Sequence, residues 1–116
     1  MTQPRELWEI FVPCMMRGKP VRTRHHREWD KVVRSLAGGL TILTPAKGQW
    51  IEPGTNTLYE ERVIPVRIAC TRNQIRQIMD FTLQHYDQLA VMAYLVSSEV
   101  IIKFREKDNG PDNERD

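Results

Sequence analysis

The chain has 116 residues, of which 41% are hydrophobic and 28% charged, and its net charge is +2. This length fits one domain of about 100–150 residues, no apolar run reaches the roughly 18 residues that a membrane-spanning helix needs, and the amino terminus lacks the basic and apolar regions of a signal peptide. Cys14 and Cys70 form no Cys-x-x-Cys pair and are interpreted as small buried side chains rather than as a disulfide or a metal pair. We therefore expect a single cytoplasmic domain over residues 1–105 and a disordered polar tail over residues 106–116.

The first elements in chain order are a strand and a helix. Residues 7–12 are rich in β-branched and aromatic side chains, which is typical of a strand. Thr23 can cap a helix over residues 24–37, and the pair Gly38-Gly39 ends this helix by permitting a left-handed turn. One helix face is predicted to be buried, because its apolar residues follow the spacing i, i+3, i+4, i+7: Trp29, Val32, Val33 and Leu36.

Further strand segments follow the first helix. Residues 40–44 are predicted to form the second strand, and residues 49–52 either continue it or form a short hairpin arm before the turn at Pro53-Gly54. Residues 58–69 form the third strand. Because Pro65 has no N–H to donate to a ladder, we expect this strand to lie at a sheet edge or to carry a bulge.

The second helix and two terminal strands complete the chain. Thr71 and Gln74 form a capping-box pattern, and Asp87 ends the helix. Its buried stripe is predicted to be Ile75, Ile78, Met79, Thr82 and Tyr86. Residues 89–96 and 99–104 are predicted as strands. The order β-α-β-β-α-β with an extra C-terminal strand predicts an α+β, ferredoxin-like fold, in which both helices cover one face of an antiparallel sheet.

The segment 89–96 is apolar on both of its alternating sides. An antiparallel strand with one solvated face alternates apolar with polar residues, so the side away from the helices needs a cover of its own. Large apolar patches are rarely left exposed to water. We therefore predict a homo-oligomer in which a second copy covers this face.

Basic residues are concentrated over residues 17–34, where the local charge balance is +5. Such a cluster is either a solvated helix face or a surface for an anionic partner. The chain lacks the basic and aromatic strand motif of RNA-reading ferredoxin-like domains, which disfavours nucleic acid as a partner.

The stretch from residue 47 to residue 70 holds the main candidate site residues. Trp50 either packs under a loop or offers its ring face to a cation or a flat base. Glu60 and Glu61 point to opposite sides of a strand, so one of them faces inward and needs a partner. That partner is either an arginine, Arg62 or Arg67, in a structural ion pair, or a cationic ligand.

The pair His25-His26 opens the first predicted helix. Adjacent helical residues point about 100° apart, and no further His or Cys stands at ligand spacing, so we predict no metal site. His25 lies at the edge of the buried face and is interpreted as a packed or hydrogen-bonded imidazole. The sequence shows no catalytic triad, phosphate loop or EF-hand pattern, and we expect no cofactor.

Residues 23–94 resemble the phage-type S-adenosylmethionine lyases, formerly called hydrolases. The shared pattern is an Arg- and His-rich helix that ends in glycine, the motif Gly48-Gln49-Trp50, the acidic pair Glu60-Glu61, and the strand and helix that follow. The Gly-Gln-Trp motif is equally similar to that of a group of uncharacterised small bacterial proteins.

The resemblance implies a trimeric ferredoxin-like assembly with small-molecule sites between subunits. In the lyases the carboxylate of S-adenosylmethionine attacks its own γ-carbon and releases methylthioadenosine and homoserine lactone. By motif position Glu61 would hold the ligand, with Glu60 as the alternative. Trp50 stands where the lyases have tyrosine, and Tyr59 is the candidate to supply the phenolic hydroxyl.

Together with Trp50 and Tyr59, Arg67 and His25 complete the expected ligand-binding set. Two other hypotheses stay open. In one, the same pocket holds a metabolite without turnover, in a binding or interaction module. In the other, which is less favoured, the basic cluster binds nucleic acid.

Overall fold

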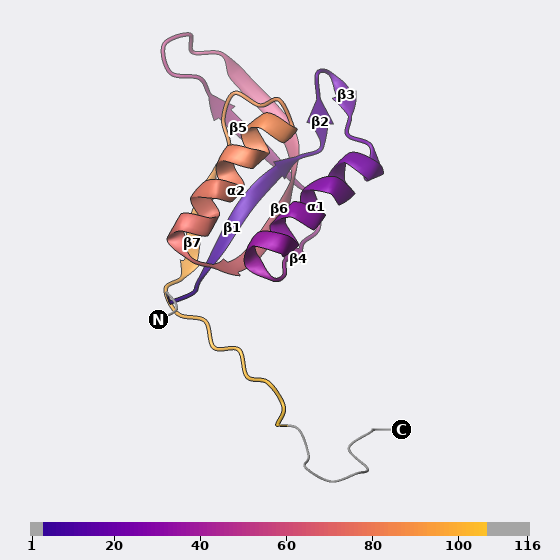
Figure 1. The fold of residues 1–116 in the computed structure, drawn as a ribbon. Coiled ribbons are helices and arrows are strands. Elements are labelled where there is room, and N and C mark those ends of the chain that lie inside the picture. The colour runs from indigo at the N-terminus through magenta and orange to yellow at the C-terminus, as the bar shows by residue number, and fades with distance from the viewer. Residues whose placement is uncertain (1–3, 107–116) are drawn as a thin grey trace.

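The computed structural model describes residues 4–106. One antiparallel sheet contains β1 (Glu6–Pro13), β4 (Thr41–Ile42), β5 (Ala46–Ile51), β6 (Leu58–Cys70) and β7 (Ala93–Ser97). The strand order is β4-β6-β1-β7, with β5 also paired to β6. The helices α1 (Thr23–Ala37) and α2 (Arg72–His85) cover the same face of the sheet (Figure 1). This arrangement confirms the predicted ferredoxin-like fold.

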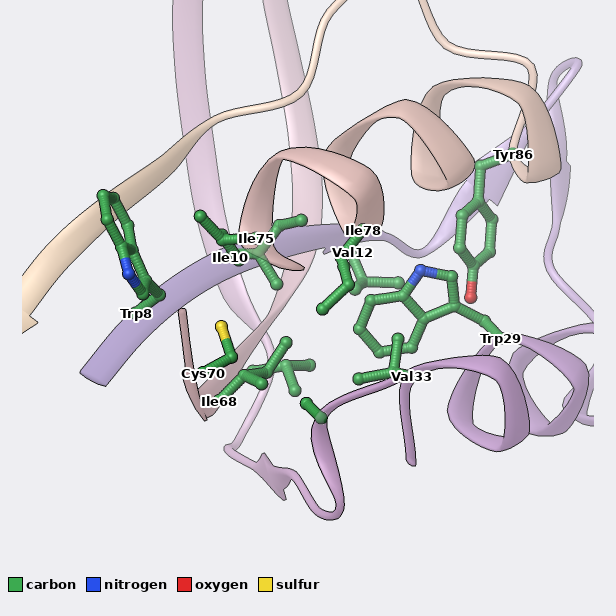
Figure 2. Packing of buried hydrophobic residues seen from close by; sticks show 12 residues of the cluster. Trp8, Ile10, Val12, Trp29, Val33, Ile68, Cys70, Ile75, Ile78 and Tyr86 are labelled. Atoms are coloured by element: carbon green, nitrogen blue, oxygen red, sulfur yellow. The ribbon is translucent and has the colours of Figure 1, made fainter. Parts of the chain in front are cut away.

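The core lies between this face and the two helices. Ile10 of β1 pairs with Val66 of β6, and because side chains alternate along a strand, these two residues and their second neighbours point to the same side. Trp29 of α1 and Ile78 of α2 fill the space above them (Figure 2). Full burial of each large apolar side chain contributes about 1.5–3 kcal/mol to stability.

The two helices begin differently. The predicted capping box of α2 is confirmed: the Thr71 hydroxyl accepts from the Gln74 backbone N–H at 3.1 Å, and the Gln74 side chain accepts from the Thr71 N–H at 2.9 Å. The prediction that Thr23 caps α1 is wrong, because Thr23 is already helical and the cap residue is Arg22, whose side chain accepts no hydrogen bond. The predicted glycine stop is confirmed at Gly38, with φ at 91°.

A small hairpin that the sequence analysis did not predict precedes α1. It consists of β2 (Met15–Met16) and β3 (Lys19–Pro20). Arg17 and Gly18 form its two-residue turn with φ values of 53° and 77°, the left-handed conformation that such hairpin turns require. Arg17 Nε also lies 2.8 Å from Asp87 Oδ2, which links the hairpin to the end of α2.

The predicted edge position of Pro65 is wrong, since β6 is an interior strand that pairs with β1 on one side and with β4 and β5 on the other. The Pro65 carbonyl accepts from the Leu43 N–H at 2.9 Å. Because the N–H and C=O of a strand residue point to the same side, the position of the missing N–H also faces residues 43–45, which connect β4 to β5. The neighbouring ladder is interrupted at the point where proline cannot donate.

The carboxyl-terminal strands are shorter than predicted. β7 starts at Ala93, so the first half of the predicted strand 89–96 is a loop, and residues 99–104 form no strand in the described part of the chain. Ile101 and Phe104 are both 84% exposed, and a strand needs a neighbour for its backbone hydrogen bonds. From residue 107 on, the predicted polar tail lies outside the described residues.

Between residues 4 and 106, neither helix has the length and apolar character needed to cross a membrane.

Candidate functional site

A pocket of about 280 Å³ lies where the β5–β6 hairpin meets β1, α2 and the loop before β7. Most of its wall is apolar, and Glu61 is the one ionisable side chain among the described residues that line it. We call it the Glu61 pocket. Its lining residues are Phe11, Pro13, Gly48, Gln49, Trp50, Glu61, Val63, Thr82, Gln88, Ala90, Val91 and Met92.

The hairpin register places Trp50 beside Glu61. Gly48 pairs with Glu61 and Trp50 pairs with Tyr59, so these side chains share one face of the hairpin. Trp50 Nε1 donates to Glu61 Oε1 at 3.2 Å. The indole also stacks on the Tyr59 ring, with 4.7 Å between ring centroids and 16° between planes. Trp50 is therefore held in one orientation by a hydrogen bond on its edge and a ring on its face.

Tyr59 supports this wall without lining the pocket. Its hydroxyl donates to Glu52 Oε1 at 2.9 Å, and this hydrogen bond raises the pKa of the Tyr59 phenol above its ordinary value. The hydroxyl is thus occupied at the hairpin end, away from Glu61. Tyr59 orients the indole.

Gly48 opens space next to Glu61. A Cβ atom at this position would lie 3.8 Å from the Glu61 carbonyl oxygen, an ordinary contact, and the backbone here needs no left-handed conformation. A glycine in a strand lacks a side chain to pack and often marks a close approach of a ligand. The missing side chain leaves the pocket open at the level of the carboxylate.

Glu61 is half-buried and has no cationic partner in the described part of the chain. Arg62 and Arg67 were the predicted partners of an inward-facing glutamate, but Glu61 accepts a hydrogen bond from Trp50 Nε1 instead. A neutral N–H leaves the negative charge of the Glu61 carboxylate uncompensated. The second carboxylate oxygen of Glu61 is available to accept a hydrogen bond from a ligand. The Glu61 pocket therefore suits a ligand with an apolar or flat body and a positive charge.

The structure does not bring Glu60 into the pocket. Glu60 points to the opposite side of β6, where its Oε2 accepts from Gln49 Nε2 at 2.7 Å and lies 3.3 Å from Lys47 Nζ. The side chains of Glu60 and Lys47 are mostly solvent-exposed. Its role as alternative ligand holder thus has no geometric support.

Arg67 belongs to a different cluster. Arg67 Nε donates to Glu9 Oε1 at 2.8 Å, and Tyr94 Oη donates to the other Glu9 oxygen. Glu9 and Arg67 are paired across β1 and β6 on the face away from the helices. Burial acts to raise the pKa of Glu9, but the hydrogen bonds from Tyr94 and Arg67 outweigh it and hold that pKa below its ordinary value. This cluster is an ion pair of the sheet.

His25 also lies outside the Glu61 pocket. Its ring stacks on that of His85, with 3.8 Å between centroids, at the junction of α1 and α2. The structure therefore brings Trp50, Tyr59 and Glu61 together and separates Glu60, Arg67 and His25 from them. The sequence did not predict the wall formed by Phe11, Gln88 and residues 90–92, because segment 89–96 has the composition of a strand throughout.

Comparison with known proteins adds evidence on the fold. No protein-family model and no curated protein matches the chain. Among solved structures, a phage SAM lyase in complex with S-methyl-5'-thioadenosine is similar at a TM-score of 0.63 and 13% identity, over 86% of each chain. The divalent cation tolerance protein CutA from Archaeoglobus fulgidus is similar at a TM-score of 0.59 and 12% identity, over 85% of this chain and 88% of that chain.

The divalent cation tolerance protein from Thermus thermophilus is similar at a TM-score of 0.54 and 14% identity, over 78% of this chain and 82% of that chain. The resemblance to the lyase and to these proteins is thus one of fold, across most of each chain and at low identity.

Proposed function

We propose that this protein binds S-adenosylmethionine in the Glu61 pocket and cleaves it to methylthioadenosine and homoserine lactone. The observation that carries the proposal is the Trp50–Glu61 pair, an uncompensated carboxylate fixed against an aromatic wall in a pocket that is mostly apolar. The ligand carries a sulfonium and an ammonium group, which fit a pocket with a single negative charge. The fold shared with a phage SAM lyase bound to the methylthioadenosine product supports the same ligand class.

The proposed reaction needs no general base. A carboxylate oxygen of the ligand attacks its own γ-carbon, the bond from that carbon to sulfur breaks, and the bonding electron pair stays on sulfur, which becomes a neutral thioether. No proton is transferred and no water is consumed. The site has only to hold the methionine chain in the attack geometry and to exclude water.

Glu61 and Trp50 can hold the ligand in this geometry and shield it from water. The free oxygen of Glu61 can accept from the ligand's ammonium group or ribose hydroxyls, while Trp50 offers a ring face to the sulfonium or the adenine. Because indole has no phenolic hydroxyl, Trp50 contributes stacking and one N–H, and that N–H is already given to Glu61.

We further propose that a second copy of the chain covers the open side of the sheet and helps to enclose the ligand, in a homo-oligomer that is a trimer by analogy with the lyases. Tyr94 of β7, which pairs with Glu9, is 41% exposed in the single chain, and Val96 of the same strand is 38% exposed. Apolar side chains on one sheet face favour such a contact.

The test is to incubate the purified protein with S-adenosylmethionine and to separate the products by chromatography with mass detection. We expect methylthioadenosine and homoserine lactone in equal amounts. Glu61→Gln keeps the shape and removes the charge, and it should lower kcat/KM by about 100-fold. Glu60→Gln is the matched control, and it should leave kcat/KM within about twofold. Absence of both products at high protein concentration would contradict the proposed reaction.

A second candidate is a metabolite-binding module without turnover. It is favoured by one feature: the Tyr59 hydroxyl, the candidate to replace the phenol of the lyases, is bonded to Glu52, and Tyr59 does not line the pocket. Calorimetric titration separates the two functions. Heat of binding together with recovery of intact S-adenosylmethionine would support the binding module. Loss of that heat in Glu61→Gln would show that the module binds its ligand in the Glu61 pocket.

A further inference from the structure

All three histidines of the chain gather at one place, outside the Glu61 pocket. His25 and His26 stand in the first turn of α1, and His85 is the last residue of α2. The His25 and His85 rings are stacked, and both contact the buried Tyr86 edge to face. The fold thus joins residues that are 60 positions apart in the sequence.

Hydrogen bonds define which ring nitrogens are free. His25 Nε2 lies 2.5 Å from the His85 carbonyl oxygen, and His85 Nε2 lies 2.8 Å from the His25 carbonyl oxygen. A carbonyl oxygen can only accept, so Nε2 carries the hydrogen in both rings. In each neutral ring, Nδ1 therefore carries the lone pair that can bind a metal ion.

Glu28 adds an oxygen next to this pair. Its Oε1 lies 3.6 Å from His25 Nδ1, one helical turn further along α1. One ligand atom from each of His25, Glu28 and His85 can be chosen so that all three lie within 4.8 Å of one another. We propose that these three residues bind a divalent transition-metal ion through both Nδ1 atoms and the Glu28 carboxylate, with the remaining coordination positions open to water.

The donor set selects the class of metal. Two imidazole nitrogens and one carboxylate suit Zn²⁺, Ni²⁺ and Cu²⁺, with Cu²⁺ the tightest, whereas Mg²⁺ and Ca²⁺ prefer all-oxygen sites. Histidines that bind metals usually donate their other ring N–H to a carboxylate or a backbone carbonyl, which fixes the tautomer and the ring orientation. The reciprocal bonds of His25 and His85 likewise go to backbone carbonyls, and they fix the tautomer that leaves Nδ1 free.

The stacked rings must turn for the ion to enter. The two ring planes are 8° from parallel, and a metal ion lies near the plane of each imidazole that binds it. Binding therefore replaces the stack with a tilted pair. Arg17, Lys19 and Arg22 line a hollow next to His25, although Arg17 is paired with Asp87. These cations oppose a positive ligand, so we expect a micromolar rather than a nanomolar dissociation constant.

The test uses the full chain without a histidine tag. Titration with Zn²⁺ near neutral pH, followed by calorimetry, should show one ion bound per chain and no heat with Mg²⁺. His25→Ala and His85→Ala should each weaken Zn²⁺ binding by more than about tenfold, and Glu28→Gln by a smaller factor. His26→Gln changes the third histidine, which lies next to His25 and outside the proposed ligand set, and it should leave the affinity unchanged.

A measurement on the unaltered chain keeps the inference testable if a histidine variant fails to fold. Electron paramagnetic resonance of the Cu²⁺-loaded protein should show coupling to two imidazole nitrogens, and ¹⁵N spectra with Zn²⁺ should place the metal at Nδ1 while Nε2 keeps its proton. The proposal is overturned if no Zn²⁺ binds at millimolar concentration, if His25→Ala and His85→Ala bind as the unaltered chain does, or if the bound ion is coordinated through Nε2. None of these results depends on turnover in the Glu61 pocket.

Discussion

At the scale of single residues, neighbours in the sequence have unlike surroundings. Glu60 and Glu61 are adjacent, yet one lies among exposed polar groups and the other faces an apolar pocket. Strand alternation accounts for this difference, and the sequence analysis predicted it. What could not be predicted is the partner: Glu61 meets an indole N–H because Gly48, directly opposite, has no side chain to intervene.

Gly48 provides a residue-scale prediction. Gly48→Leu should leave the fold intact, since the position is extended and its Cβ meets only ordinary contacts. The added side chain should fill the pocket and lower affinity for S-adenosylmethionine by more than about tenfold, as measured by calorimetry. Gly39→Leu, outside the Glu61 pocket, is the control. Undiminished affinity in Gly48→Leu would place the ligand elsewhere.

Glu9 provides a prediction for pH. Its folded pKa lies below the ordinary value of 4.5, so the folded state binds fewer protons than the unfolded state as the pH falls below that value. The stabilisation is therefore complete above 4.5 and is lost as the pH falls through the lowered folded pKa. Urea unfolding at a series of acidic pH values should show this loss in the unaltered chain and a smaller one in Glu9→Gln. Equal slopes would contradict the assignment.

At the scale of elements, the helices were predictable and the strand ends were not. The spacing of Trp29 and Val33, and the capping pair Thr71 and Gln74, are local signals, and each determined a helix face or a helix start. Strand extent depends on a partner that is often far away in the sequence. Residues 99–104 have strand composition but no neighbour in the single chain, and Pro65 fits an interior strand only because the adjacent ladder is interrupted beside it.

The uncapped start of α1 provides an element-scale prediction. Arg22 has cap geometry, with φ at −74° and ψ at 149°, but no side-chain acceptor, and no acidic residue stands in the first turn. Arg22→Asp should raise the free energy of unfolding by about 1 kcal/mol, since it adds a cap and a charge that suits the helix dipole. Arg34→Asp, in the last turn, should lower the free energy of unfolding. Urea unfolding measures both, and changes of equal sign would contradict this account.

At the scale of the whole molecule, the sheet has one covered and one open face. The helices bury the first, while the second carries the Glu9–Arg67–Tyr94 cluster. The edge strand β7 also has exposed apolar residues. The two-sided apolar pattern of segment 89–96 predicted another copy on this face. The described structure is consistent with that expectation only from Ala93 onward, where β7 begins.

Light scattering tests the expectation. The mass of one chain is 13.6 kDa, and we expect a multiple of it at micromolar concentration. Val96→Lys places a charge on the exposed part of β7 and should shift the equilibrium toward single chains, because an unpaired charge buried in an interface is strongly unfavourable. Met15→Lys changes an apolar residue of similar exposure on β2 and should not alter the mass. A monomeric mass for the unaltered chain would contradict the proposed assembly.

The stacked histidines at the ends of the two helices have a practical consequence for spectroscopy. Because the chain has no histidine elsewhere, every imidazole resonance and every reaction with a histidine-selective reagent reports on the junction of α1 and α2. The protein thus carries a built-in probe of helix docking, which can be followed without any label during unfolding, assembly or ligand addition.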